Sequence, residues 1–307
     1  MRERLRLTAI LVAMGAGWGL CVPLGKLAVS TGHQPFGLIF WDLVIVAVFL
    51  GAVCALRGRS LPLSRSALFV YAVVAALGTA IPGWAYYASA VHLPAGVLSI
   101  LMSTVPMFAF PVALLLGNDT FRPVRLLGLM CGLGGIILLV GPEASLPERA
   151  MAAFIPVALI APFCYAAENN FVARWGTAGL DAFQVVAGAA VLGSIVMLPV
   201  AVLTGQWVDP RPPYGVAEGA LVLSALTHAM VYSVYVWLVG RAGAVFTAQT
   251  SYLVTGFGVI WSMALLSESY SGFIWAALAL MLAGLFLVQP RPSIRLVPTV
   301  AVDEAGR

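Results

Sequence analysis

The sequence predicts an all-α membrane protein in which ten transmembrane helices form two inverted five-helix repeats around a central cavity. The first supporting observation is composition: 62% of the 307 residues are hydrophobic and only 9% are charged, against about 25% charged residues in a typical soluble domain. The second is that the apolar residues form continuous runs of about the 20 residues that a helix needs to cross a bilayer. The third is that the two halves of the chain overlay. This composition excludes an ordinary soluble enzyme and a disordered chain.

Ten apolar runs predict the ten helices in order along the chain. The first follows a basic segment and resembles a secretory signal, but we interpret it as an uncleaved span because nine further spans follow it. The fifth is the weakest, since Arg125 lies near its start. The longest connection, 204–216, is rich in Pro and aromatic residues and suits an interfacial loop. The predicted spans are 7–29, 36–56, 67–91, 95–116, 123–140, 152–173, 182–203, 217–239, 244–266 and 272–289.

The positions of the basic residues predict the orientation. If the N-terminus lies in the cytoplasm, thirteen arginines fall on the inner side and only Arg149 and Arg211 on the outer side, while Lys26 lies within the first span. This bias satisfies the positive-inside rule, and an even number of spans returns the C-terminus to the cytoplasm. We therefore expect a multi-pass protein of the inner (plasma) membrane, surrounded by lipid and with both termini cytoplasmic. Because orientation explains the bases, no nucleic-acid partner is expected.

An internal repeat appears when the sequence is shifted by 149 residues. The third to fifth spans then overlay the eighth to tenth without a gap, and Tyr86 meets Tyr235. A shift near 147 brings Trp18 onto Tyr165 in the first and sixth spans. Because each repeat holds an odd number of spans, the second is inverted relative to the first, as in secondary transporters whose substrate site lies where the halves meet. The predicted units are a first repeat over 1–147, an inverted second repeat over 148–293 and a cytoplasmic tail over 294–307.

Several segments resemble the EamA-type drug/metabolite transporter superfamily. The resemblance covers nearly the whole chain and implies ten helices in two inverted repeats, a central cavity and alternating access. It also implies the movement of amino acids and other small metabolites. The segments that carry it are Trp18-Gly19 followed by Lys26, the Tyr-rich end of the third span, the stretch from Pro106 to Asp119, and YLVTGFGVIWSMALLSE from Tyr252 to Glu268.

The chain departs from this family pattern at two positions. Members often carry Arg early in the second span, where this chain has Asp42. Thr255 replaces the usual Pro of the ninth span, so Gly256 and Gly258 are expected to supply any break in that helix. The first departure puts the family's charge arrangement at the outer mouth in doubt.

Lys26 and Asp42 are charged residues deep in the first two spans. Charged groups at such depth cost a few kcal/mol each on insertion scales and indicate function by default. Both lie about one helical turn inside the outer surface, so they could pair with each other or contact substrate. The alternative is that Lys26 extends its amine to the surface while Asp42 faces an outer vestibule.

Three titratable residues are candidates for proton coupling, namely Asp42, Glu168 and His228. Glu168 lies within three consecutive polar residues in the inner third of the sixth span, at least one of which must avoid lipid. His228 lies near the middle of the eighth span, and histidine titrates near neutral pH. The alternatives are a salt bridge between Glu168 and Arg174 and an interhelical hydrogen bond for His228.

The candidate substrate-binding residues combine the charged groups above with aromatic and hydrogen-bonding side chains. His228, Tyr232 and Tyr235 share one face of the eighth span, which makes that face the best candidate for cavity lining. The alternative is helix packing in which each hydroxyl bonds a neighbouring carbonyl. The remaining candidates are Trp18, Tyr86, Ser103, Gln249 and Tyr252.

The fourth and ninth spans are expected to be moving parts. Pro106 and Pro111 interrupt the fourth, and Thr255 with its neighbouring glycines loosens the ninth at the matching place. Proline kinks without function are the alternative. Asp119 and Glu268 follow these two spans at equivalent positions and are expected to cap helices rather than to carry chemistry.

Small residues predict close helix packing in the fifth and tenth spans. Gly128 and Gly132 form a GxxxG pattern, which Ala279 and Ala283 match in the second repeat. Such a pattern permits close approach of two helices, either within a protomer or across a homodimer.

These features favour a secondary transporter of small organic metabolites, with export of amino acids or similar amphipathic solutes as the expected activity. The sequence lacks the GxxxxGK[ST] loop of an ATP-driven pump and the HExxH and GxSxG motifs of an intramembrane enzyme, so no catalytic activity is expected. The four cysteines form no CxxC, and neither a metal nor another cofactor is expected. A passive channel or facilitator and a lipid-type scramblase remain the alternatives.

Overall fold

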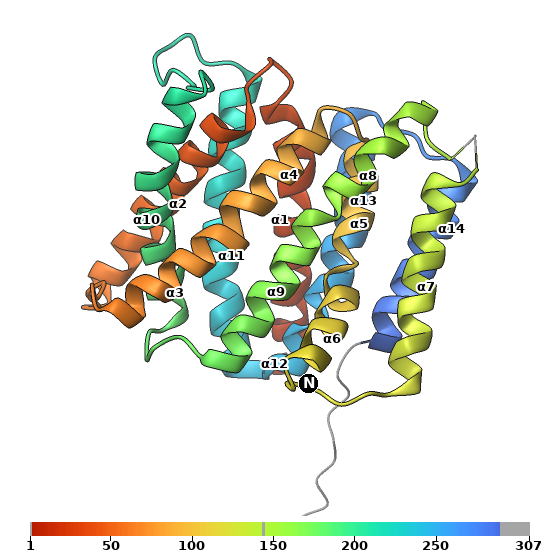
Figure 1. The fold of residues 1–307 in the computed structure, drawn as a ribbon, viewed down its shortest axis with the longest axis horizontal. Helices are drawn as coiled ribbons and strands as arrows, with labels where there is room; N and C mark the ends of the chain where they lie inside the picture. The colour runs from red at the N-terminus through yellow and green to blue at the C-terminus, as the bar shows by residue number, and fades with distance from the viewer. Residues whose placement is uncertain (1, 143–144, 289–307) are drawn as a thin grey trace, which may run out of the picture.

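The computed structural model describes residues 2–142 and 145–288, and its helices account for all ten predicted spans (Figure 1). Within these residues, eight helical stretches are long and apolar enough to cross a membrane, and two shorter apolar helices, α13 and α14, complete the set. The predicted all-helical fold class is confirmed. The predicted tail over 294–307 lies outside the described residues.

The helices of the first half pair into five spans. The third span is continuous through a π-helical turn, and the fourth is broken once. Their bounds are α1 (Arg2–Ala28), α2 (Pro35–Leu56), α3 (Arg65–Ala75), η1 (Ala76–Ala80), α4 (Ile81–Ala90), α5 (Ala95–Met102), α6 (Val105–Leu115) and α7 (Pro123–Val140).

The second half repeats this order. Its first span begins with a 3₁₀ turn and a short helix, and its fourth span is again broken. Their bounds are η2 (Arg149–Phe154), α8 (Ile155–Ala158), α9 (Ile160–Trp175), α10 (Ala182–Leu203), α11 (Val216–Ala242), α12 (Ala244–Thr247), α13 (Thr250–Leu266) and α14 (Gly272–Val288).

The packing of the helices shows that the halves are inverted repeats. α1 packs on α11 and α13, and its counterpart α9 packs on α4 and α6, which are the counterparts of those two helices. In the same way α2 packs on α11, and its counterpart α10 packs on α3. The pairs α2·α10 and α7·α14 each join a helix to its own counterpart, and α5·α13 joins the fourth span of one repeat to the fourth span of the other. Counterparts run in opposite directions (Figure 1), which is the arrangement of inverted-topology transporters.

The described chain starts and stops at the same end of the bundle (Figure 1). We call this the near end and the opposite one the far end. The positive-inside bias predicts that the near end faces the cytoplasm.

Proline positions explain two irregularities beside the centre of the bundle. Pro82 has no N–H to donate to the preceding turn, and η1 lies directly before it. Pro106 likewise follows the break between α5 and α6, where the hydroxyls of Ser103 and Thr104 donate to the carbonyls of Ile100 and Leu101 at 2.7 and 2.6 Å. The two hydroxyls are therefore paired within the protein, as a membrane interior requires of polar groups.

The ninth span breaks at a different place from the one expected. α13 runs without interruption through Thr255, Gly256 and Gly258, and the break lies earlier, between α12 and α13. The prediction was wrong because these residues keep their backbone hydrogen bonds, and the Thr255 hydroxyl adds a bond of 3.1 Å to the carbonyl of Ser251. Glycine without proline does not remove a donor from the helix.

The glycines of α7 pack within the protomer. A Cβ atom on Gly128 would lie 2.8 Å from the carbonyl oxygen of Gly284 in α14, and one on Gly135 would lie 3.3 Å from that of Ala277. The small residues matched from the sequence, Ala279 and Ala283, are exposed instead. The intramolecular interpretation of the GxxxG pattern therefore holds, with Ala277 and Gly284 at the contact with α14 in place of Ala279 and Ala283, and with Gly132 against Met107 of α6.

Replacing Gly128 by Ala should lower the stability of the protein. The new methyl group would meet the backbone of α14, and overpacking of this kind costs about 1–3 kcal/mol. The measurement is thermal unfolding of the purified protein in detergent. Gly51→Ala in α2 is the matched control, because a Cβ there meets nothing within 4 Å. Equal melting temperatures for the two variants would contradict the packing of α7 on α14.

Candidate functional site

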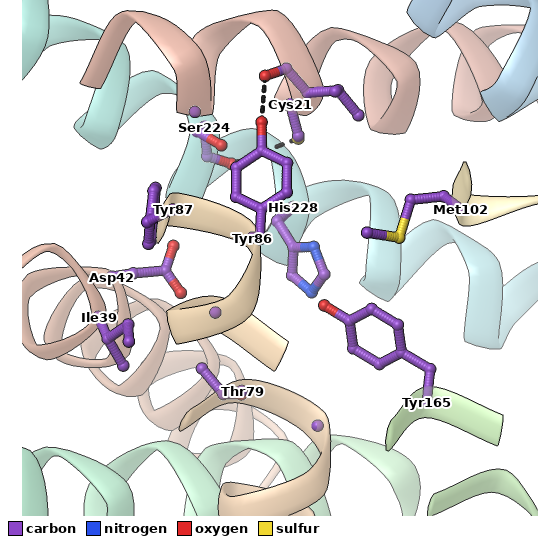
Figure 2. Close-up of a pocket in the computed structure, with 14 residues that line it drawn as sticks. Cys21, Ile39, Asp42, Thr79, Tyr86, Tyr87, Met102, Tyr165, Ser224 and His228 are labelled. Atoms are coloured by element: carbon purple, nitrogen blue, oxygen red, sulfur yellow. Dashed lines mark hydrogen bonds between the residues drawn. The ribbon is translucent and has the colours of Figure 1, made fainter. Parts of the chain in front are cut away.

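A cavity of about 190 Å³ lies at the centre of the bundle, lined by residues of α1, α2, η1, α4, α5, α9 and α11 (Figure 2). Helices from both repeats contribute to it, so it lies where the halves meet. Three predicted site residues, Asp42, Tyr86 and His228, are part of its wall. Its lining residues are Cys21, Val22, Gly25, Ile39, Asp42, Gly78, Thr79, Gly83, Tyr86, Tyr87, Met102, Tyr165, Ser224 and His228.

Glycine in α1 positions Tyr86 at the cavity wall. A Cβ on Gly25 would lie 2.7 Å from the Tyr86 hydroxyl, so only glycine lets the ring lie against α1. The hydroxyl donates a hydrogen bond to the carbonyl of Val22, one helical turn earlier, as the dashed line in Figure 2 shows. The phenol is thereby fixed, and its ring packs edge-on against Tyr87 at 5.4 Å.

Asp42 projects from α2 into the cavity (Figure 2). Among the described residues its carboxylate has neither a hydrogen-bond partner nor an ion-pair partner. In Figure 2 it lies between Tyr87 and Ile39, with the ring of Tyr86 facing it across the view. A carboxylate in this position is the strongest unpaired charge on the cavity wall.

Lys26 does not pair with Asp42, contrary to one of the two readings of the sequence. Its amine donates to the carbonyls of Ala90 and Leu93 at 2.9 and 2.6 Å. These carbonyls belong to the C-terminal end of α4, where backbone acceptors lack helical partners and the helix dipole favours a cation. Lys26 therefore binds the carbonyls at and just after the end of α4, and it is not among the residues that line the cavity.

The predicted face of α11 is only partly at the cavity. His228 lines it and is exposed there, although it lies in the middle of a span. Trp18 packs beside the histidine, with ring centroids 6.0 Å from His228 and 5.3 Å from Tyr235. Tyr232 and Tyr235 are half-buried and follow His228 toward the near end. Trp18, Tyr232 and Tyr235 thus lie on the near-end side of the cavity and are not among its lining residues.

Glu168 lies directly behind the cavity wall. A Cβ on Gly78, a lining residue in η1, would lie 2.8 Å from the Glu168 carboxylate oxygen Oε2. Tyr165, one turn earlier in α9, lines the cavity. The alternative salt bridge is not formed, because the ion pairs of the described residues do not include Glu168 with Arg174. Glu168 therefore adds a second carboxylate to the site.

Three other candidates lie away from the cavity. Ser103 is buried at the break between α5 and α6, and its hydroxyl is used within that helix. Gln249 is exposed at the break between α12 and α13. Tyr252 follows in α13, and its buried hydroxyl has no hydrogen-bond partner.

The sequence reading missed several residues that line the cavity. For Tyr165 a signal existed, because the shift near 147 places it on Trp18. For Thr79 the signal was Pro82, since a proline that follows by three residues marks an irregular turn. The other missed side chains with chemistry are Cys21, Tyr87, Met102 and Ser224, and they lack a distinguishing local pattern.

Polar contacts between the repeats close the far end of the bundle. The Glu268 carboxylate, which follows α13, accepts hydrogen bonds from the backbone N–H groups of Ala95 and Gly96 at 2.8 and 3.1 Å. It therefore caps α5, as expected for a structural acid. Tyr270 donates to the same carboxylate at 2.6 Å. Together with Lys26, these bonds tie the ends of α1, α4, α5 and α13 together.

The loop between α10 and α11 adds to this closure. The indole N–H of Trp41 donates to the carbonyl of Val208 at 2.9 Å, and the backbone N–H of Phe36 donates to the side chain of Gln206 at 3.0 Å. The ring of Trp207 packs at a tilt of 51° against that of Trp41, with centroids 5.6 Å apart. The loop predicted to be interfacial therefore also seats on the far end of α2.

Comparison with known proteins gives one family and one fold. The EamA-like transporter family matches the chain twice, over residues 7–141 and 153–289. The chain is 22% identical over 292 residues to a protein named uncharacterized inner membrane transporter YedA in Escherichia coli strain K12, covering 94% of this chain and 92% of the relative. The same match is found in Escherichia coli O157:H7. One crystal structure shares the fold, with a TM-score of 0.62 and 16% identity over 92% of this chain and 96% of the other.

The separate environments of Lys26 and Asp42 lead to a prediction about stability. Lys26→Met and Asp42→Asn should change the free energy of unfolding additively, to within about 0.5 kcal/mol, because the two side chains share no partner. The measurement is a double-mutant cycle by SDS-driven unfolding in detergent micelles. A coupling energy above about 1 kcal/mol would instead indicate the direct pair.

Proposed function

Since the chain belongs to the EamA-like transporter family, within the drug/metabolite transporter superfamily, we propose that it is a secondary transporter that moves small organic metabolites across the inner membrane by alternating access. The observation that carries the proposal is a central cavity between two inverted repeats that are held together at the far end by hydrogen bonds. A site between inverted repeats can be exposed to either side when one repeat rocks against the other.

We propose amino acids or similar amphipathic solutes as substrates, with export as the direction. The cavity supports a small solute, because about 190 Å³ corresponds to space for on the order of ten water molecules. Its wall combines apolar side chains with hydroxyl groups and a carboxylate, as expected for a solute with one polar head. Export fits a resting state that takes up substrate at the near end, if that end faces the cytoplasm.

Three side chains are proposed to couple transport to protons. Asp42 and His228 are on the cavity wall, and Glu168 lies directly behind it at Gly78. A proton held at one of them in only one of the two states would link substrate movement to the proton gradient. Counting protons moved per substrate in proteoliposomes distinguishes this coupling from passive exchange.

The closed far end suggests how the second state is built. Lys26 lies in the last turn of α1, and Arg174 lies in the last turn of its counterpart α9. The shift of 149 places the two carbonyls that hold Lys26 on Val239 and Ala242, near the end of α11. In the present structure Arg174 is exposed. We propose that in the second state Arg174 donates to these carbonyls and closes the near end while Lys26 releases its own.

Counterflow in proteoliposomes tests the proposed function. Proteoliposomes that contain the purified protein are preloaded with unlabelled substrate. They should transiently accumulate labelled substrate with saturable kinetics, because a transporter exchanges one solute for another. A channel or scramblase would give flux without counterflow. Linear, non-saturable flux of every permeant solute tested would contradict the transporter assignment.

The gating mechanism is tested by comparing Lys26→Met with Arg174→Met, which should differ in their effect on access to the cavity from the far end. Cys21 lines the cavity and serves as the reporter, in a background in which the other three cysteines are replaced by Ala. A small impermeant thiol reagent should label wild-type Cys21 faster from the near end. Lys26→Met should increase labelling from the far end, since it removes a far-end bond, and Arg174→Met should not. Equal effects of the two variants would contradict the proposed exchange.

A further inference from the structure

We infer that the cavity binds a monovalent organic cation, an amine with a small apolar body, through the Asp42 carboxylate. This inference rests on the proposed transport function and, among the amphipathic solutes proposed there, favours amines over amino acids. Four features of the cavity carry it: the sign of the charges around it, the free carboxylate, the aromatic wall and its size.

The charges at the cavity are acidic. Among the lining residues, all of which lie in the described part of the chain, Asp42 is the only one with a formal charge at neutral pH when His228 is neutral. A second acid lies directly behind the wall, since the Glu168 carboxylate lies against Gly78. Lys26, the one lysine of the chain, is directed to the end of α4 by its two carbonyl partners. An anionic substrate would therefore meet two acidic side chains and no lysine or arginine.

The free state of Asp42 is what a cation would correct. A carboxylate removed from bulk water is unfavourable unless a positive group or several hydrogen-bond donors reach it. The described residues supply neither, yet the side chain reaches into a cavity large enough for a ligand (Figure 2). An ammonium group at this point supplies the missing charge and up to three N–H donors.

The aromatic wall favours a cation over a second anion. Tyr86 and Tyr87 stand edge to face beside Asp42, and Tyr165 approaches from α9 on the opposite side (Figure 2). The faces of such rings attract a cation that approaches them. The Tyr86 hydroxyl already donates to Val22, so it is not free to donate to a carboxylate. The other hydroxyl donors of the wall carry no charge, so they would not offset the repulsion between a ligand carboxylate and the two acids. They belong to Thr79, Tyr87, Tyr165 and Ser224.

Apolar side chains complete the wall and define the body of the ligand. Val22, Ile39 and Met102 face the same space as Asp42, and Figure 2 shows Met102 on the side away from the carboxylate. A ligand with its amine at Asp42 therefore extends its apolar part toward Met102. The volume limits that part to about one ring, because the space equals on the order of ten waters.

The test compares four probes that share one phenyl ring and differ in charge: phenethylamine, phenylalanine, phenylpropionate and 2-phenylethanol. Binding to the purified full-length protein is measured by titration calorimetry and by protection of Cys21 from alkylation. Phenethylamine should bind at least about tenfold more tightly than each of the other three. Asp42→Asn, which keeps the shape of the side chain, should remove that preference. Asp209→Asn is the matched control, because that acid is in an exposed loop where it pairs with Arg211.

Two results would overturn the inference. One is that phenethylamine binds no more tightly than 2-phenylethanol, or does not bind at all. The other is that Asp42→Asn retains the preference and Cys21 stays unprotected by the amine. Counterflow in proteoliposomes separates this outcome from failure of the transport proposal. Amine binding without counterflow would support the cation site and contradict transport, whereas counterflow of phenylalanine without amine binding would support transport and contradict the cation site.

Discussion

The hydrocarbon interior of a bilayer offers backbone N–H and C=O groups no water, and every other feature of this structure follows from that constraint. It makes the chain cross as helices, and it makes each exception conspicuous. Where α5 ends, the hydroxyls of Ser103 and Thr104 donate to carbonyls of its last turn. Where helix ends meet at the far end, Lys26 and Glu268 supply a donor and an acceptor to backbone groups that have no helical partner. Lys26 and Glu268 are thus both bonded to backbone groups at helix ends.

The same constraint separates what the sequence could predict from what it could not. The apolar runs set the ten spans and their order, because a span must be apolar over a fixed length. The sequence also shows which charged residues lie inside the spans. Their partners were not predictable. Lys26 donates to the carbonyl of Ala90 at the end of α4, 64 positions away in the chain, and not to Asp42 at similar depth in the next span. The sequence shows that Lys26 and Asp42 are opposite charges at similar depth, but it does not show that the carbonyls of Ala90 and Leu93 lie within reach of Lys26.

The cavity shows a similar division. Asp42, Tyr86 and His228 were predicted from depth and residue type, and they line it. Trp18 and Tyr235 were predicted on the same grounds, but they pack against each other below it. Depth gives the layer of the membrane in which a side chain lies, whereas the direction in which it points depends on local helix geometry. Residues such as Thr79 and Tyr165 reach the cavity through that geometry and could not be ranked by residue type alone.

The π-helical turn η1 has a consequence for the phase of α4. A turn of this kind accommodates one extra residue within the helix, and one residue corresponds to a rotation of about 100°. Everything after Ala80, including Tyr86 and Tyr87, is therefore turned by that angle relative to an uninterrupted helix that begins at Arg65. A single-residue insertion thus acts as an angular offset, and the azimuth of two aromatic rings is encoded by the length of a segment that contains neither of them.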